Sequence, residues 1–157
     1  MKKMMMAAAA GLLLLSACHD QATNKETNTD TIKGPENTTM MPVSSCYAST
    51  SNGDSVQMKV DVFEKVVTGT LQYNWKEKDD NKGEYEGVMK GDTLFADYRF
   101  MSEGKESTRQ VAFLIKDGTA TEGYGDVEEK DGKMVFKNPG ALQFGKDIVL
   151  SKTQCNY

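Results

Sequence analysis

The stretch EYEGVMKGDTLFADYRF, residues 84–100, decides the fold because it has the pattern of two β-strands joined by a tight turn. Gly91-Asp92 lies at its centre, and a glycine in the first position of a two-residue turn favours a type II′ hairpin. The pairs expected across this turn are Met89–Leu94, Gly87–Ala96 and Tyr85–Tyr98. Because side chains alternate between the two faces of a strand, the apolar or small residues collect on one face and most of the charged residues on the other.

The same combination of turns and alternation recurs between Cys46 and Cys155. Further two-residue turn candidates are Asn52-Gly53, Gly104-Lys105, Asp117-Gly118 and Asp131-Gly132. Pairing across Asn52-Gly53 and Glu64-Lys65 predicts Tyr47–Met58, Ser49–Val56, Met58–Leu71, Val60–Gly69 and Val62–Val67, and the loop 76–82 allows Tyr73 to face Tyr85. A slip of one residue would reverse the faces of a strand. The agreement of turn chemistry with the hydrophobic pattern therefore supports one register.

Short strands joined by tight turns predict an all-β protein, here an antiparallel up-and-down meander of about eight strands that closes into a barrel. The predicted barrel resembles the lipocalin and avidin-like group in architecture only. Cys46 begins the first strand and Cys155 ends the last, and these two strands are neighbours in a closed meander. Export favours a disulfide between them on the outer face of the barrel, the alternative being two free thiols.

The first residues have the order of a bacterial export signal. Lys2 and Lys3 precede an apolar run, residues 4–15, which is too short to cross a bilayer of about 30 Å as a helix. The run ends in Leu-Ser-Ala-Cys18, which resembles the bacterial lipobox. This resemblance implies a signal peptide at 1–17 and lipid on Cys18. The polar segment 18–44 then reads as a flexible tether, and 45–157 as the barrel domain.

Three phrases, "KGDTLFADYRFMSEG", "STRQVAFL" and "EGYGD", resemble a set of uncharacterised lipoproteins of Bacteroidota. The resemblance implies a cell-envelope protein anchored to a membrane through lipid on Cys18, with the outer membrane favoured and its periplasmic or surface face left open. It implies no activity. Two or three acyl chains give stable anchoring, because each buried methylene contributes about 0.8 kcal/mol.

The composition excludes several kinds of chemistry. His19, in the tether, is the only histidine, and a Cys46–Cys155 disulfide would leave the domain without a free thiol. This removes histidine-based acid/base catalysis, cysteine nucleophiles and His or Cys metal sites. No motif indicates a cofactor, and we expect no catalytic residues. Removal of the predicted signal peptide takes away two lysines and changes the net charge from −4 to −6, which argues against nucleic acid as a partner.

One group of charged residues departs from the alternation. Pairing across Asp117-Gly118 predicts Phe113–Glu122, Val111–Tyr124 and Arg109–Asp126, which places three charges on the inward face. Buried charges cost several kcal/mol unless they are paired. One interpretation is a structural pair between Arg109 and a carboxylate near an open barrel end. The other is a recognition patch in a pocket lined by Tyr73, Tyr85, Tyr98 and Phe100. The candidate binding residues are Tyr98, Arg109, Glu122, Tyr124 and Asp126.

Three functions follow from this sequence. The first is a non-enzymatic, lipid-anchored binding module for a small ligand or a protein partner in the envelope. The second is a structural or inhibitory envelope protein whose loops meet a partner enzyme such as a lysozyme. The third, weaker one is a carboxylate-dependent hydrolase. The volume left inside the barrel separates the first two.

Overall fold

The structure is a computed structural model that describes residues 41–156. The predicted leader, the lipidation site at Cys18 and the tether up to residue 40 lie outside the described residues and stay predictions. Strand β1 begins at Val43, slightly before the domain boundary predicted at residue 45. Among residues 41–156, no helix has the length and apolarity needed to cross a membrane.

Ten strands and one 3-10 turn follow one another in residues 41–156. They are β1 (Val43–Ser51), β2 (Asp54–Phe63), β3 (Val66–Asn74), β4 (Asn81–Lys90), β5 (Thr93–Ser102), β6 (Lys105–Lys116), β7 (Thr119–Tyr124), β8 (Val127–Lys130), β9 (Lys133–Phe136), η1 (Pro139–Ala141) and β10 (Gln143–Thr153). The β1–β2 turn places Asn52 at φ 54° and Gly53 at φ 94°. Asparagine and glycine tolerate these left-handed angles, so the sequence itself selects the turn.

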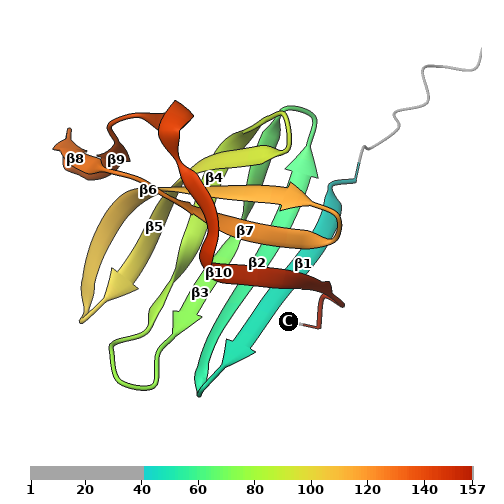
Figure 1. The fold of residues 1–157 in the computed structure, drawn as a ribbon, viewed down its shortest axis with the longest axis horizontal. Coiled ribbons are helices and arrows are strands. Elements are labelled where there is room, and N and C mark those ends of the chain that lie inside the picture. Colours follow the sequence, from blue (N-terminus) through green and yellow to red (C-terminus); the bar gives the residue numbers. More distant parts are fainter. Residues whose placement is uncertain (1–40, 157) are drawn as a thin grey trace, which may run out of the picture. The chain divides into compact units, whose positions relative to one another are not determined.

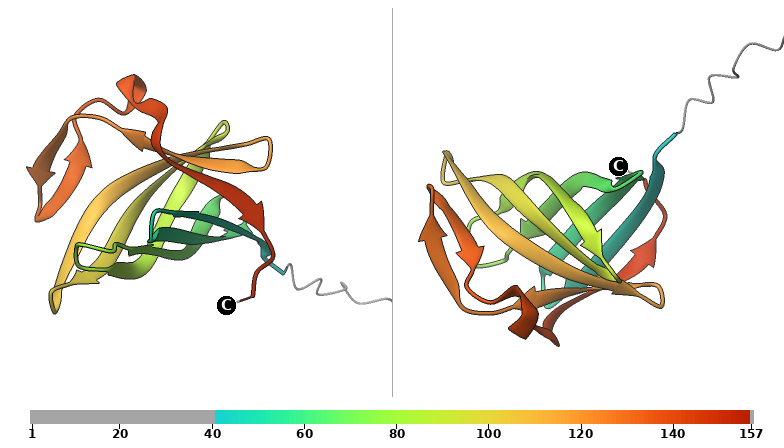
Figure 2. Two further views of the ribbon diagram at one scale, coloured as in Figure 1. Left: turned by 60° about the horizontal axis from the view of Figure 1, so that its bottom comes forward. Right: turned by 90° about the horizontal axis from the view of Figure 1, so that it is seen from above.

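Eight of the strands form a closed antiparallel barrel. Strands β1 to β7 pair with their neighbours in chain order, and β10 fills the position between β7 and β1. Figure 1 shows β6, β7 and β10 crossing the wall that β1 to β4 form. The predicted barrel is confirmed, with one addition: a small hairpin of β8 and β9 precedes the last barrel strand and stands outside the ring (Figure 2).

The register of the first five strands agrees with the prediction in all but one place. The pairs Met89–Leu94, Gly87–Ala96, Tyr85–Tyr98, Met58–Leu71, Val60–Gly69, Val62–Val67, Tyr47–Met58 and Ser49–Val56 are all present. The exception is Tyr73, which pairs with Asn81 instead of facing Tyr85. Strand β4 begins earlier than expected, so Tyr85 lies opposite Gly69. A Cβ added at Gly69 would lie 2.6 Å from the Tyr85 hydroxyl oxygen, so only glycine fits beneath this ring.

Two predictions fail around β6. The β5–β6 turn is Glu103-Gly104, one residue before the predicted Gly104-Lys105. The β6–β7 ladder ends at Phe113 and Glu122, and β9 then lies beside β6, with Met134 opposite Arg109. The predicted pairs Val111–Tyr124 and Arg109–Asp126 are therefore wrong, because the inserted hairpin occupies the place that β7 was expected to fill.

The two ends of the barrel are connected differently. At the turn end, the connections are the tight turns at residues 64–65, 91–92 and 117–118, and the chain enters β1 and leaves β10. At the loop end, the connections include the loop 75–80 and the crossover 125–142 that carries β8, β9 and η1. Large side chains fill the interior: those less than 2% exposed include Tyr73, Tyr98, Phe113, Met58, Leu71, Leu94 and Leu150.

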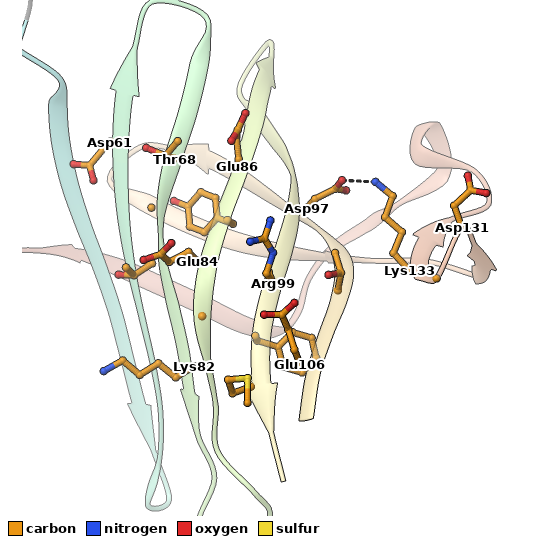
Figure 3. Close-up of a pocket in the computed structure, with 18 residues that line it drawn as sticks. Asp61, Thr68, Lys82, Glu84, Glu86, Asp97, Arg99, Glu106, Asp131 and Lys133 are labelled. Atoms are coloured by element: carbon orange, nitrogen blue, oxygen red, sulfur yellow. Dashed lines mark hydrogen bonds and ion pairs between the residues drawn. The ribbon is translucent and has the colours of Figure 1, made fainter. Parts of the chain in front are cut away.

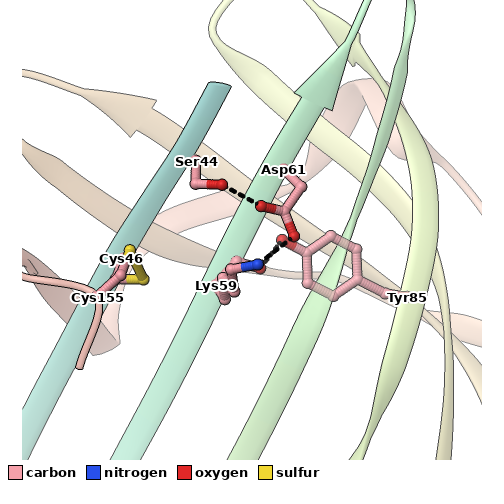
Figure 4. Close-up of a disulfide and its surroundings, with 6 residues drawn as sticks. All are labelled: Ser44, Cys46, Lys59, Asp61, Tyr85 and Cys155. Carbon is pink, nitrogen blue, oxygen red and sulfur yellow. Dashed lines mark hydrogen bonds and ion pairs between the residues drawn. A yellow bond between two sulfur atoms is a disulfide. The ribbon is translucent and has the colours of Figure 1, made fainter. Parts of the chain in front are cut away.

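A disulfide between Cys46 and Cys155 closes the barrel seam, as predicted. Their Cα atoms lie 5.3 Å apart. Cys46 alternates with inward-facing Tyr47 and therefore lies on the outer face, where its side chain is nevertheless fully buried. Figure 4 shows the disulfide beside the outward pair of Lys59 and Asp61, whose Nζ and Oδ2 atoms lie 2.8 Å apart. The bond supports the β1–β10 ladder, which is shorter than the ladder between β1 and β2.

Candidate functional site

Aromatic and charged side chains gather inside the barrel at the loop end. We call this set the mouth cluster: Tyr73, Trp75, Tyr98, Phe100, Arg109, Glu122 and Tyr124. Strand β3 and the residue after it supply the first two, β5 the next two, β6 the arginine and β7 the last two. Four of the five candidate binding residues predicted from the sequence therefore lie together.

Asp126, the fifth candidate, lies elsewhere. It is exposed in the link between β7 and β8, and its carbonyl oxygen accepts a hydrogen bond from the Lys137 amide at 2.9 Å. Its predicted inward position is wrong, because the β6–β7 ladder ends before the chain reaches it.

Glu122 is the buried carboxylate of the cluster, with an exposed fraction of 6%. The hydroxyl of Tyr73 donates to its Oε1 at 2.8 Å, and the hydroxyl of Tyr124 donates to its Oε2 at 3.2 Å. Burial raises the pKa of Glu122 above the usual value of 4.5, and these two hydrogen bonds, together with the positive charge of Arg109, offset only part of that rise. Both carboxylate oxygens already have donors.

Arg109 lies among three aromatic rings. Its guanidinium carbon is 5.2 Å from the centre of the Tyr73 ring, 5.7 Å from Tyr98 and 5.5 Å from Phe100. A cation within about 6 Å of a ring face is attracted by the ring quadrupole. The rings themselves are ordered in stacks: Tyr98 on Phe100 at 4.9 Å, and Tyr73 on Trp75 at 5.7 Å.

Arg109 has one buried donor, its Nε atom, that is unused among residues 41–156. Neither of the ion pairs among the described residues includes Arg109; they are Lys59–Asp61 and Lys133–Asp97. The predicted ion pair of Arg109 with Glu122 or Asp126 does not form, because tyrosine hydroxyls occupy Glu122 and Asp126 lies outside. A buried donor without an acceptor is unfavourable by about 1–3 kcal/mol. An acceptor that came within reach of this N–H group would remove that cost.

The three tyrosines act as donors. Burial raises the pKa of Tyr73, Tyr98 and Tyr124, so their hydroxyls keep their protons at neutral pH. The hydroxyl of Tyr98 donates to the Leu71 carbonyl oxygen at 2.8 Å. The tyrosine hydroxyls and the Glu122 carboxylate therefore all have hydrogen-bond partners, whereas the buried Nε of Arg109 has none.

Two hollows lie near the barrel wall. One, of about 450 Å³, lies at the loop end and includes Trp75 in its lining, together with residues of the β1–β2 turn and of the loop 75–80. The other is a groove of about 970 Å³ on the outer face of β3 to β6, beneath the β8–β9 hairpin (Figure 3). Lys133 of the hairpin binds Asp97 of the wall and forms one side of this groove. The sequence did not predict the groove, because it depends on where the inserted hairpin folds.

The predicted pocket lining was correct for Tyr73, Tyr98 and Phe100, wrong for Tyr85, which lies opposite Gly69, and lacked Trp75. The sequence does carry a signal for Trp75. Tyr73 and Trp75 are two residues apart, as are Tyr98 and Phe100, so each pair lies on one face of its strand. The position of Arg109 between the pairs depends on the β5–β6 register, where Tyr98 lies opposite Arg109.

The comparisons and the metal-ligand geometry add no further assignment. Within residues 41–156, no group of three or more His, Cys, Asp or Glu side chains is arranged to hold a metal ion. No family model, no curated protein and no solved structure matches the chain.

Proposed function

We propose that the protein is a non-enzymatic binding module that takes a small ligand at the mouth cluster, on the rim of the barrel, because large side chains fill the interior itself. The observation that carries the proposal is the buried, unpartnered Nε of Arg109 at the end of the barrel that holds the two long connections, 75–80 and 125–142. Trp75, Phe100 and Arg109 are partly exposed, so a ligand that enters from the loop end can reach them. A site that holds rigid rings and one unmet polar group is typical of ligand recognition.

The same side chains favour binding over catalysis. Carboxylate-dependent glycoside hydrolysis uses two carboxyl groups on either side of the reacting bond. The mouth cluster contains one carboxylate, Glu122, and both of its oxygens accept hydrogen bonds from tyrosines.

The proposal can be tested by NMR on the ¹⁵N-labelled full chain with benzoate, benzyl alcohol and benzylamine as probes. We expect at least one of them to shift the indole N–H resonance of Trp75 and the amide resonance of Tyr124. The amide of Glu86, whose side chain lines the outer groove, serves as the control and should not move. Shifts confined to the groove, or no shifts at the mouth cluster with any probe, would contradict the proposal.

A second candidate function is docking of a protein partner in the outer groove. The observation in its favour is the groove of about 970 Å³ with its mixed charges, including Glu84, Glu86 and Arg99. Reversing charge with Glu84→Lys and Glu86→Lys should weaken such docking and leave probe binding at the mouth cluster unchanged.

As part of the same proposal, the module is anchored in the bacterial envelope through lipid on Cys18, which the lipobox resemblance supports. Metabolic labelling with a fatty-acid analogue should mark the wild-type chain and not Cys18→Ser. Equal labelling of both chains would refute the anchor and would leave the binding proposal standing.

A further inference from the structure

We infer that the ligand of the mouth cluster is an organic carboxylate with a flat apolar body, and that Arg109 holds its carboxyl group. This inference rests on the proposed function and adds the chemical class of the ligand. It follows from three properties of the cluster: which polar group is unmet, which surfaces are open to contact, and which charge the site already contains.

The unmet group is a donor. Arginine presents N–H groups in a planar fork that matches the two oxygens of a carboxylate. Among the described residues, nothing accepts a hydrogen bond from the buried Nε of Arg109. Glu122 is the nearby acceptor, but Tyr73 and Tyr124 donate to its two oxygens. Arg109 as a residue is partly exposed, so the carboxylate of a ligand can approach it from the loop end, and a shift of the rim rings would bring that acceptor to the buried Nε. Neither hydrogen bond to Glu122 has to break.

The open surfaces are aromatic. Tyr73 and Tyr98 are at most 1% exposed, so they support Arg109 from below. Phe100 and Trp75 stack on these two rings and are only partly buried, and Tyr124 is 36% exposed. The Tyr98–Phe100 planes differ by 12° and the Tyr73–Trp75 planes by 22°. Nearly parallel rings at the rim offer flat faces to a flat ligand.

The charge of the site argues against a cationic ligand. Aromatic rings often bind cations, but here Arg109 already lies over the faces of Tyr73, Tyr98 and Phe100. A second cation would meet this positive charge. The one negative group, Glu122, is 6% exposed and lies behind the tyrosines that donate to it.

The test compares three probes that share one ring system: 2-naphthoate, 2-naphthamide and 2-naphthamidine. Titrated against the ¹⁵N-labelled full chain at neutral pH, the anion should bind more tightly than the neutral amide by about 10- to 100-fold. The amidine should bind most weakly. The side-chain Nε–H resonance of Arg109 should move on addition of the carboxylate, because it gains an acceptor.

Variants assign the preference to Arg109. Arg109→Met keeps an apolar stem and loses the charge, so it should bind 2-naphthoate and 2-naphthamide equally. Arg109→Lys should keep part of the preference. Arg99→Met is the matched control: Arg99 lies next to Tyr98 in β5 but is exposed on the outer face, and its loss should leave the preference for 2-naphthoate over 2-naphthamide unchanged. The melting temperature of each variant shows whether it is folded. If Arg109→Met does not fold, the ranking of the three probes on the wild-type chain and the Arg109 Nε–H shift decide.

The outcomes separate the two proposals. Equal binding of all three probes at the mouth cluster, tighter binding of the amidine, or a preference for the carboxylate that survives in Arg109→Met would each overturn the carboxylate inference and leave the binding module intact. Absence of 2-naphthoate binding would also overturn it. The binding module itself fails only if the benzoate, benzyl alcohol and benzylamine series leaves the mouth cluster unperturbed.

Discussion

The two ends of the barrel are formed by the same strands but hold different side chains. In the interior at the turn end, Leu94 and Val67 are at most 1% exposed, and their side chains carry no polar atoms. Inside the loop end, Arg109 and Glu122 interrupt the apolar interior. The comparison teaches that aliphatic packing dominates the interior at the turn end, while the buried donor without an acceptor lies at the end that holds the two long connections. Four predictions test this division, from the largest expected effect to the smallest.

The largest effect should come from the disulfide at the turn end. Replacing Cys46 and Cys155 by alanine opens a ring with a sequence separation of 109. The loop-entropy estimate for such a ring is about 4 to 5 kcal/mol of unfolding free energy as an upper value. Guanidinium denaturation of the purified chain measures the loss. Cys18→Ala, outside the ring, is the control, and a loss below about 1 kcal/mol would show that the seam does not depend on the bond.

Truncation should distinguish the two interiors directly. Leu94→Ala removes a fully buried side chain and should lower the unfolding free energy by about 2–5 kcal/mol. Arg109→Met should change it by less than about 1 kcal/mol, because the lost attraction to the rings is offset by removal of an unsatisfied donor. Urea denaturation of both variants makes the comparison. A loss of about 3–5 kcal/mol for Arg109→Met would indicate a buried ion pair after all.

Hydroxyl deletion tests the support of Glu122. Tyr73→Phe removes the donor to Oε1, in the more buried of the two hydrogen bonds, and should cost about 1–3 kcal/mol of unfolding free energy. Tyr124→Phe, which removes a longer hydrogen bond from a 36% exposed ring, should cost less. Thermal denaturation at neutral pH ranks the two. The reverse order would mean that Tyr124 is the main donor.

The smallest effect is a difference in pH dependence. Because the pKa of Glu122 is raised on folding, the folded chain holds this proton more tightly than the unfolded chain. Its contribution to stability is therefore full below about pH 4.5 and falls as pH rises through the raised pKa. Glu122→Gln should remove that decline from the curve of unfolding free energy against pH. An unchanged slope above pH 4.5 would mean that Glu122 titrates normally.

Asp61, on the outer wall, gives the matched control with the opposite sign. Burial raises the pKa of Asp61. The hydrogen bonds from Lys59 and Ser44, together with the charge of Lys59, lower this pKa by more than burial raises it, so it lies below the usual 3.8. Its contribution is present above that value and is lost as pH falls through the lowered pKa. Asp61→Asn should therefore change only the acid side of the curve and leave the Glu122 region unaltered.

The barrel could be predicted because its hairpins carry local information. A two-residue turn fixes the register of the strands on either side, and alternation then assigns each residue to a face. Met89 opposite Leu94 and Tyr47 opposite Met58 follow from a few neighbouring residues each. The disulfide followed from closure, since a closed meander brings its first and last strands together.

The mouth cluster could be predicted only in part. The prediction that Arg109 and Glu122 point inward was correct. Nothing local in the sequence shows that β7 separates from β6 beyond Glu122. Whether β9 or the end of β7 lies beside Arg109 depends on how the inserted hairpin packs against the barrel wall. The choice of partner for Glu122, tyrosine rather than arginine, also depends on distances between strands that are far apart in the chain.

The disulfide also determines how a pulling force would pass through the molecule. If the chain is stretched between residue 41 and residue 156, the load runs from Cys46 through the two sulfur atoms to Cys155 and bypasses the strands between them. The ladders are then not peeled apart, and the ends lengthen only by the few residues outside the bond. When its termini are pulled, the oxidised barrel therefore keeps its folded length, and the loop end is not deformed.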